Sequence, residues 1–157
     1  MKLQKGGASH PSYSLNISTI DSNASYTASS QYSSQFQPAY AVYGSGIGWI
    51  PVNTRDSWWK ASYSKRFLIY TILWAWTHSG NASFSGTWTI TFEYSDDDIN
   101  YKVVPGSENT TLTYRNECNS QRCFMADIKA RYIKMIMSTP NPTVASGCKI
   151  TIFGEEC

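Results

Sequence analysis

The chain has 157 residues, which is enough for one domain with a substantial core and too few for two ordinary domains. Charged residues make up only 15% and aromatic residues reach 15%, a profile typical of β-rich and often extracellular modules. A net charge of +2 without a basic stripe argues against nucleic acid as the main partner. No apolar run reaches the roughly 18 residues of a transmembrane segment.

Residues 1–12 are rich in Gly, Ser and Lys without periodicity, and we expect a flexible arm that precedes one domain over residues 13–157. The arm lacks the apolar core of a signal peptide and is expected to be the start of a fragment. Alternating Tyr13, Leu15 and Ile17 predict an opening strand. Pro38, followed by Gly44, predicts one helical turn over residues 38–43.

The middle of the chain is dominated by extended patterns. Residues 58–63 are predicted to form one strand, and residues 67–76, apolar on both faces, another in the middle of the fold. Apolar and polar side chains alternate strictly over residues 88–95, and the alternation resumes over residues 99–104. The three aspartates between them, residues 96–98, favour a turn. This pattern predicts a central β-hairpin with Trp88, Ile90, Phe92 and Tyr94 toward the core.

Shorter strands are predicted towards the end of the chain, over residues 110–114, 123–126, 132–137 and 149–154. No amphipathic helix and no internal repeat is evident in the sequence. About eight strands at this spacing predict an all-β fold, with two packed antiparallel sheets in a jelly-roll sandwich.

The hairpin Phe-Glu-Tyr-Ser-Asp-Asp-Asp-Ile-Asn-Tyr at residues 92–101 resembles that of discoidin, or coagulation-factor type C, domains, which belong to the galactose-binding-like superfamily. Four further segments follow the family order, namely residues 27–32, Trp49, Trp58 and residues 130–135. The resemblance spans about residues 25–154. The chain departs from the family at Asp98, where the hairpin glycine stands, at Tyr43, and at Ser62, where an aspartate is frequent.

The four cysteines lie at positions 118, 123, 148 and 157. Cys118 and Cys123 close a short loop and are the local candidates for a disulfide, whereas a straight strand between Cys148 and Cys157 forbids that pair. Cys157 matches the cysteine that commonly closes the family domain. Its state stays open between a free thiol, a bond to Cys148 if the chain bends, and a bond to an adjoining segment.

An enzyme is not expected. His10 and His78 have no recognisable catalytic partners, and residues 96–98 are better explained as a turn than as the paired carboxylates of a glycosidase. We expect no cofactor. Some family members hold structural calcium through loop carbonyls and a carboxylate, but Tyr43 replaces that carboxylate here and weakens the expectation. The cysteine spacing without neighbouring histidines favours a disulfide or free thiols over zinc.

The resemblance implies that ligands meet the loops at one end of the sandwich, here residues 31–43, 45–57 and 75–86. A pyranose stacks on aromatic rings and needs polar partners for its hydroxyls. The candidate ligand-binding residues in these loops are Tyr32, Phe36, Trp49, Arg55, Asp56, Trp76, His78 and Asn81. Arg55 and His78 are the strongest of them. Trp49 is left open between ligand binding and the core, and Trp58 is expected in the core.

The leading functional hypothesis is a non-catalytic, galactose-type carbohydrate-binding module within a larger extracellular or surface protein. The alternative is an adhesion module that binds a protein or a phospholipid membrane through Tyr32 and Phe36, and a scaffold subunit of an intracellular complex is a third reading. Four N-glycosylation sequons, at Asn16, Asn23, Asn81 and Asn109, give mild support to secretion.

Overall fold

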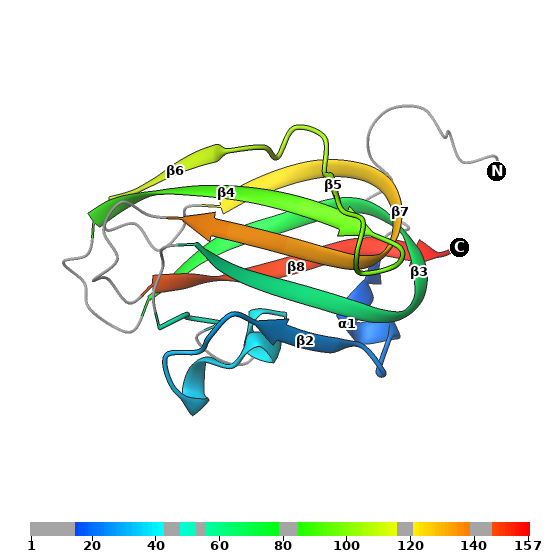
Figure 1. Ribbon diagram of the computed structural model, residues 1–157, viewed down its shortest axis with the longest axis horizontal. Helices are drawn as coiled ribbons and strands as arrows, with labels where there is room; N and C mark the ends of the chain where they lie inside the picture. Colours follow the sequence, from blue (N-terminus) through cyan, green and yellow to red (C-terminus); the bar gives the residue numbers. More distant parts are fainter. Residues whose placement is uncertain (1–14, 43–47, 53–55, 79–84, 116–120, 139–145) are drawn as a thin grey trace.

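The computed structural model describes residues 15–42, 48–52, 56–78, 85–115, 121–138 and 146–157. Eight strands dominate these residues (Figure 1), and every pairing between named strands is antiparallel. The strands are β1 (Leu15–Asn16), β2 (Ser25–Ala28), β3 (Ser57–His78), β4 (Ser85–Ser95), β5 (Lys102–Val103), β6 (Thr110–Arg115), β7 (Gln121–Ser138) and β8 (Ser146–Glu156). The described residues also contain three short helical segments, which are α1 (Ile17–Ile20) and two 3-10 turns, Ser34–Phe36 and Pro38–Ala41.

Two long strands, β3 and β7, bend and take part in both layers of the sandwich (Figure 1). In the first layer, residues 57–62 of β3 lie between β2 and residues 132–137 of β7, and β4 pairs on the other side of β7. In the second layer, residues 67–75 of β3 lie between β8 and residues 121–130 of β7, and residues 76–78 pair with β8 alone. The all-β sandwich is thus confirmed, built by one curled sheet that folds over at the bends.

The continuity of β3 and β7 differs from the prediction, which divided each into two strands. The register of β3 against β7 shifts between Ser62 and Phe67, where the polar Ser64 stands at the bend. Partners outside the ladder hydrogen-bond the backbone there: Asp21 accepts from Ser64 N at 2.8 Å, and Arg131 Nε donates to Tyr63 O at 3.0 Å. Polar residues therefore bend the strand without ending it.

The opening strand is shorter than predicted. It ends at Asn16, and residues 17–20 form the helical turn α1 instead of continuing the alternation. The physical reason is capping, because the Asn16 side chain accepts a hydrogen bond from Ser18 N at 3.1 Å and Ile17 is buried at the start of the turn. The helical turn predicted after Pro38 is confirmed as the 3-10 turn Pro38–Ala41.

The predicted hairpin is present, but β4 lies between β7 and the edge strand β5, so β3 and β7 are the central strands. Ile90 and Phe92 are fully buried, whereas Ile99 is 80% exposed and only Lys102–Val103 forms β5. The turn is longer than the alternation suggested, because the Asp97 carboxylate accepts hydrogen bonds from the backbone of residues 99 and 100.

The core lies between the two layers and is rich in aromatic side chains. Phe92 of the first layer contacts Phe124 of the second, with ring centroids 5.4 Å apart. Trp59 and Trp74 are fully buried, whereas Trp58 is half-buried on the outer face of β3. The expectation that Trp58 belongs to the core was therefore wrong, since the alternation of β3 directs Trp59 inward and Trp58 outward.

The predicted disulfide is not formed, because Cys123 is a free thiol, as are Cys148 and Cys157. Cys118 lies outside the described residues. The prediction placed Gln121 and Arg122 in a loop closed by the disulfide. In the structure they are extended residues of β7 that pair with residues 74 and 75 of β3, and Cys123 is part of the same strand. Within the described ranges, no helix has the length and apolar character needed to cross a membrane.

Candidate functional site

Two loop segments form a hydrogen-bonded unit at the start of β8. We call residues 29–37 and 48–52 together the loop platform. Tyr32 N donates to Ile50 O at 2.7 Å, Ile50 N donates to Phe36 O at 3.4 Å, and Val52 N donates to Ser30 Oγ at 3.0 Å. These bonds cross between the two segments, so the platform is positioned by its own backbone as well as by the sandwich beneath it.

Trp49 anchors the platform to the sandwich and is fully buried. Its Nε1 donates to Ser30 O at 2.9 Å, and its backbone exchanges hydrogen bonds of 3.1 and 2.9 Å with Cys148 at the start of β8. The approach is so close that a Cβ built on Gly147 would lie 1.8 Å from Trp49 O. A buried ring cannot stack on a ligand, which corrects the candidate role of Trp49 and places it in the core.

The two aromatic candidates of the first segment have different environments. Phe36 is 6% exposed and belongs to the interior, which corrects its candidate role as a protruding contact. Tyr32 is 53% exposed, and its ring meets the Phe36 ring edge to face with centroids 6.0 Å apart. Phe36 therefore packs against Tyr32 in a geometry that aromatic pairs prefer, while Tyr32 as a residue stays more than half exposed.

Two further residues near the platform are exposed. Val52 is 61% exposed, and Asp56, immediately before β3, is exposed with a φ of 55°. A positive φ is tolerated by aspartate better than by most side chains, which explains the residue type at this entry to the strand. Tyr32 and Asp56 are thus the sequence-predicted candidates that the structure places at the surface.

The structure describes the remaining predicted ligand-binding residues only in part. Arg55 and Asn81 lie outside the described residues, and the side chains of Trp76 and His78 do so as well. The backbone of Trp76 pairs with Cys148, the residue that also pairs with Trp49. The last residues of β3 therefore lie one strand away from the platform, and the contribution of these four residues stays a prediction.

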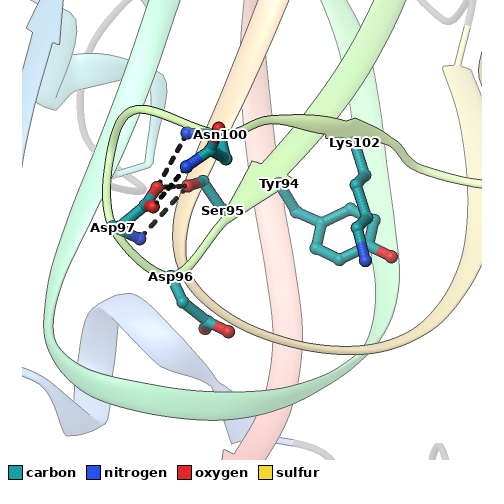
Figure 2. Close-up of a pocket in the computed structure, with 6 residues that line it drawn as sticks. All are labelled: Tyr94, Ser95, Asp96, Asp97, Asn100 and Lys102. Atoms are coloured by element: carbon teal, nitrogen blue, oxygen red, sulfur yellow. Dashed lines mark hydrogen bonds between the residues drawn. The ribbon is translucent and has the colours of Figure 1, made fainter.

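The hairpin follows the C-terminal end of β4, where Ser95 pairs with Tyr132 at the bend of β7. Asp97 Oδ1 accepts hydrogen bonds from Asn100 N at 2.7 Å, Ile99 N at 2.9 Å and Ser95 Oγ at 2.9 Å, and Oδ2 accepts from Asn100 Nδ2 at 2.7 Å (Figure 2). The bonds from Asn100 and Ile99 hold the pKa of the Asp97 carboxyl well below its ordinary value.

The other two aspartates of the hairpin form ion pairs. Asp98 accepts from Lys60 Nζ at 2.8 Å and from the Tyr101 hydroxyl, and this Lys60 bond is the main cause of the lowered pKa of Asp98. Asp96 accepts from Arg66 Nε at 2.9 Å. The carboxylates of Asp97 and Asp98 each accept from several donors, which suits a turn better than a general acid, so their contacts agree with the interpretation of residues 96–98 as a turn.

A hollow of about 200 Å³ lies beside this hairpin, lined by Tyr94, Ser95, Asp96, Asp97, Asn100 and Lys102 (Figure 2). The sequence pattern assigned Tyr94 to the core, and Tyr94 is partly buried and packs against the core cluster. Its cross-strand partner Lys102 is exposed on the edge strand β5, and both residues line the hollow.

The described residues contain no group of three His, Cys, Asp or Glu side chains that could hold a metal ion. Among the sequons, Asn23 and Asn109 are exposed, whereas Asn16 is half-buried and uses its side chain to cap α1. Asn81 lies outside the described residues. The described sequons at positions 23 and 109 are therefore accessible to a modifying enzyme.

Comparisons with known proteins agree with this architecture. A model of the F5/8 type C domain family matches residues 25–150. Wild-type discoidin II from Dictyostelium discoideum has a TM-score of 0.67 at 15% identity, over 93% of this chain and 60% of that chain. CpGH89CBM32-5 from Clostridium perfringens, solved in complex with GalNAc-beta-1,3-galactose, has a TM-score of 0.62 at 12% identity, over 83% of this chain and 95% of that chain.

A third similar structure is the family 32 CBM from C. perfringens NanJ in complex with galactose, with a TM-score of 0.57 at 15% identity, over 84% of this chain and 94% of that chain. The comparison with curated proteins found no match. Structural matches at these low sequence identities show the fold alone. The family assignment rests on the family model, which covers most of the sequence. The chain therefore belongs to the F5/8 type C domain family.

Proposed function

We propose that the chain is a non-catalytic carbohydrate-binding module that holds a galactose-type sugar at the loop platform. The observation that carries the proposal is the accessible ring of Tyr32, which is supported edge to face by Phe36 on a platform fixed by cross-segment hydrogen bonds. Two structurally similar proteins were solved with galactose or a galactose-containing sugar, which supports this ligand class.

The chemistry of the platform suits a pyranose. An aromatic ring of this exposure offers a flat apolar surface for the C–H groups of one sugar face. The Asp56 carboxylate, exposed at the entry to β3, accepts hydrogen bonds from hydroxyls. Arg55, Trp76, His78 and Asn81 remain in the proposal as the polar and aromatic groups that complete the site. A single shallow site of this kind binds with a Kd in the range of about millimolar to micromolar.

Adhesion through the loop tips is the second candidate, favoured by one observation. Val52 is 61% exposed on the same platform as Tyr32, so an apolar side chain accompanies the ring. The two-aromatic tip expected for membrane insertion is not supported, because Phe36 is only 6% exposed. Because a single ring with one valine buries little apolar surface in a membrane, we favour carbohydrate binding over membrane adhesion.

The setting of the module belongs to the same proposal. We infer that it works in an extracellular or cell-surface protein, as one part of a larger chain. The accessible sequons at Asn23 and Asn109 support this inference, since a glycan there would project into solvent.

The test is calorimetric titration of the chain with a galactose-terminated oligosaccharide. Tyr32→Ala should weaken binding about tenfold or more, because removing the stacked ring forfeits about 1.5 kcal/mol or more of apolar burial. Tyr32→Phe, which keeps the ring, should stay within about threefold of the wild type. Met125→Ala is the matched control, since this side chain is 41% exposed on the outer face of β7.

Wild-type affinity in a folded Tyr32→Ala protein would contradict the platform assignment. Loss of phosphatidylserine-vesicle binding in Tyr32→Ala and in Val52→Ser, with no response to any sugar in the wild type, would favour adhesion. The two variants change exposed side chains, so circular dichroism should report an unchanged fold in both.

A further inference from the structure

The hairpin hollow lies apart from the loop platform, at the end of the sandwich where β3 and β7 bend. Tyr94 and Lys102 are cross-strand partners on β4 and β5, and Figure 2 shows their side chains on the same side of the hollow. Asp97 and Asn100 form the turn on the other side, joined by the hydrogen bonds drawn in Figure 2. The hollow therefore has an aromatic wall with an ammonium group on one side and amide and carboxylate groups on the other.

Several of these groups retain hydrogen-bonding capacity. Within the part of the chain that the structure describes, Lys102 makes no ion pair and no hydrogen bond, so its ammonium group is available to a ligand. A carboxylate oxygen can accept two hydrogen bonds, and Asp97 Oδ2 accepts one, from Asn100 Nδ2. The carbonyl oxygen of the Asn100 side chain accepts none from the described residues.

The charges around the hollow balance. Asp96 is paired with Arg66, and Asp98 is paired with Lys60. Among the residues that line the hollow, the charged groups without an ion-pair partner in the described residues are the ammonium of Lys102 and the carboxylate of Asp97, one of each sign. A neutral ligand gains from both groups, whereas an anionic ligand is attracted by Lys102 but repelled by the Asp97 carboxylate, which has no ion-pair partner among the described residues.

The size of the hollow limits the ligand to one ring. Its volume of about 200 Å³ is below the roughly 300 to 1,000 Å³ of pockets that enclose drug-sized molecules. The hydroxyls of a pyranose donate and accept at once, which matches an ammonium donor beside carboxylate and amide acceptors. The apolar face of the same ring matches the Tyr94 side chain.

We propose that the hairpin hollow is a second carbohydrate subsite, which binds a single neutral pyranose between Tyr94 and Lys102 on one side and Asp97 and Asn100 on the other. The proposal rests on carbohydrate binding as the function of the domain, and it makes the domain bivalent. Two subsites, one on the loop platform and one beside the hairpin, can hold two branches or two neighbouring chains, so binding to a multivalent glycan surface is tighter than binding to either sugar alone.

The experiment is a titration of the ¹⁵N-labelled chain with galactose, followed by amide shifts. The hairpin set comprises the amides of Asp97, Ile99, Asn100 and Lys102, and the platform set those of Tyr32, Ile50 and Val52. Both sets should move and saturate, each with its own Kd of about 1 mM or weaker. Galacturonate, which carries a carboxylate, should move the hairpin set less than galactose at equal concentration.

Lys102→Met removes the ammonium and keeps the apolar stem of the side chain. It should raise the Kd of the hairpin set about tenfold or more and leave the platform set unchanged, because a hydrogen bond to a charged group is lost there only. Lys129→Met is the matched control, because Lys129 is an exposed lysine paired with Leu68 on the second layer, and both Kd values should stay as in the wild type.

The outcomes separate the two proposals. A silent hairpin set beside a responding platform overturns the second subsite and leaves the proposed function standing. A responding hairpin set beside a silent platform supports the subsite and overturns the platform assignment. An unchanged hairpin Kd in Lys102→Met, or galacturonate binding as tight as galactose, overturns the subsite as described. No shift in either set with galactose or a panel of neutral sugars overturns both.

Discussion

Replacing Trp49 tests whether this tryptophan is a core anchor or a ligand contact. The ring is fully buried, and Nε1 donates to Ser30 O at 2.9 Å across the two segments of the loop platform. Trp49→Phe keeps an aromatic ring and removes the donor, which leaves the Ser30 carbonyl without this bond and costs about 1 to 3 kcal/mol of unfolding free energy. Trp49→Ala adds a cavity and should cost about 3 to 5 kcal/mol.

The assay is urea unfolding followed by tryptophan fluorescence and circular dichroism, with the midpoint and the slope fitted separately. Trp58→Phe is the matched control, because Trp58 is half-buried on the outer face of the neighbouring strand and contacts Lys134, whose Nζ lies 5.5 Å from the ring centroid. Phe keeps a ring opposite Lys134 Nζ, so the weakened cation–π contact should cost about 1 kcal/mol or less.

The reasoning would be refuted if Trp49→Phe left the unfolding free energy at the wild-type value and abolished sugar binding in the folded protein. That pattern belongs to an exposed stacking residue. The structure predicts the reverse order: a clear loss of stability in Trp49→Phe, and binding that survives wherever the protein remains folded.

Thiol accessibility and alkaline stability give two further predictions. A brief pulse of iodoacetamide on the native chain, followed by peptide mapping, should modify the exposed Cys123 and Cys157 and spare Cys148. Cys148 is fully buried, and this burial raises the pKa of its thiol well above the ordinary value. Protection of Cys123 in non-reduced material would contradict its free thiol. The hydrogen bond that the Tyr70 hydroxyl donates to Glu155 at 2.6 Å raises the pKa of Tyr70 from 10.0 to about 12. Because the unfolded chain loses this proton first, the stability that this group contributes is present below pH 10 and is lost as the pH rises towards about 12. Tyr70→Phe should flatten the fall in the urea midpoint over that interval, and an unchanged pH dependence would show that Tyr70 does not titrate as described.

Strict alternation allowed the sandwich to be predicted from the sequence. The pattern over residues 88–95 correctly indicated that Ile90 and Phe92 face the core, because burial on one side of a strand has a period of two. The same rule did not predict that β3 continues through its bend. The exposed Ser64 interrupts the apolar pattern there, and its backbone N–H donates to Asp21, a residue 43 positions away. Strand continuity there depends on a distant partner that no local pattern contains.

The candidate site was less predictable for the same physical reason. Adjacent tryptophans at positions 58 and 59 both fit a strand, and only the register decides that Trp59 faces inward. Trp49 lies in a loop whose burial depends on its backbone pairing with Cys148. Loop composition therefore indicated a region rich in aromatic residues, but which ring is accessible followed only from the packing of Phe36 beneath Tyr32.

Carbohydrate binding is tested most directly by applying the purified wild-type chain to a glycan array beside phosphatidylserine vesicles. We predict retention on neutral, galactose-terminated glycans and loss of that retention in folded Tyr32→Ala, with no enrichment on the vesicles. Retention on no glycan, together with vesicle binding that requires Tyr32 and Val52, would contradict the carbohydrate-binding function and establish the loop platform as an adhesion surface.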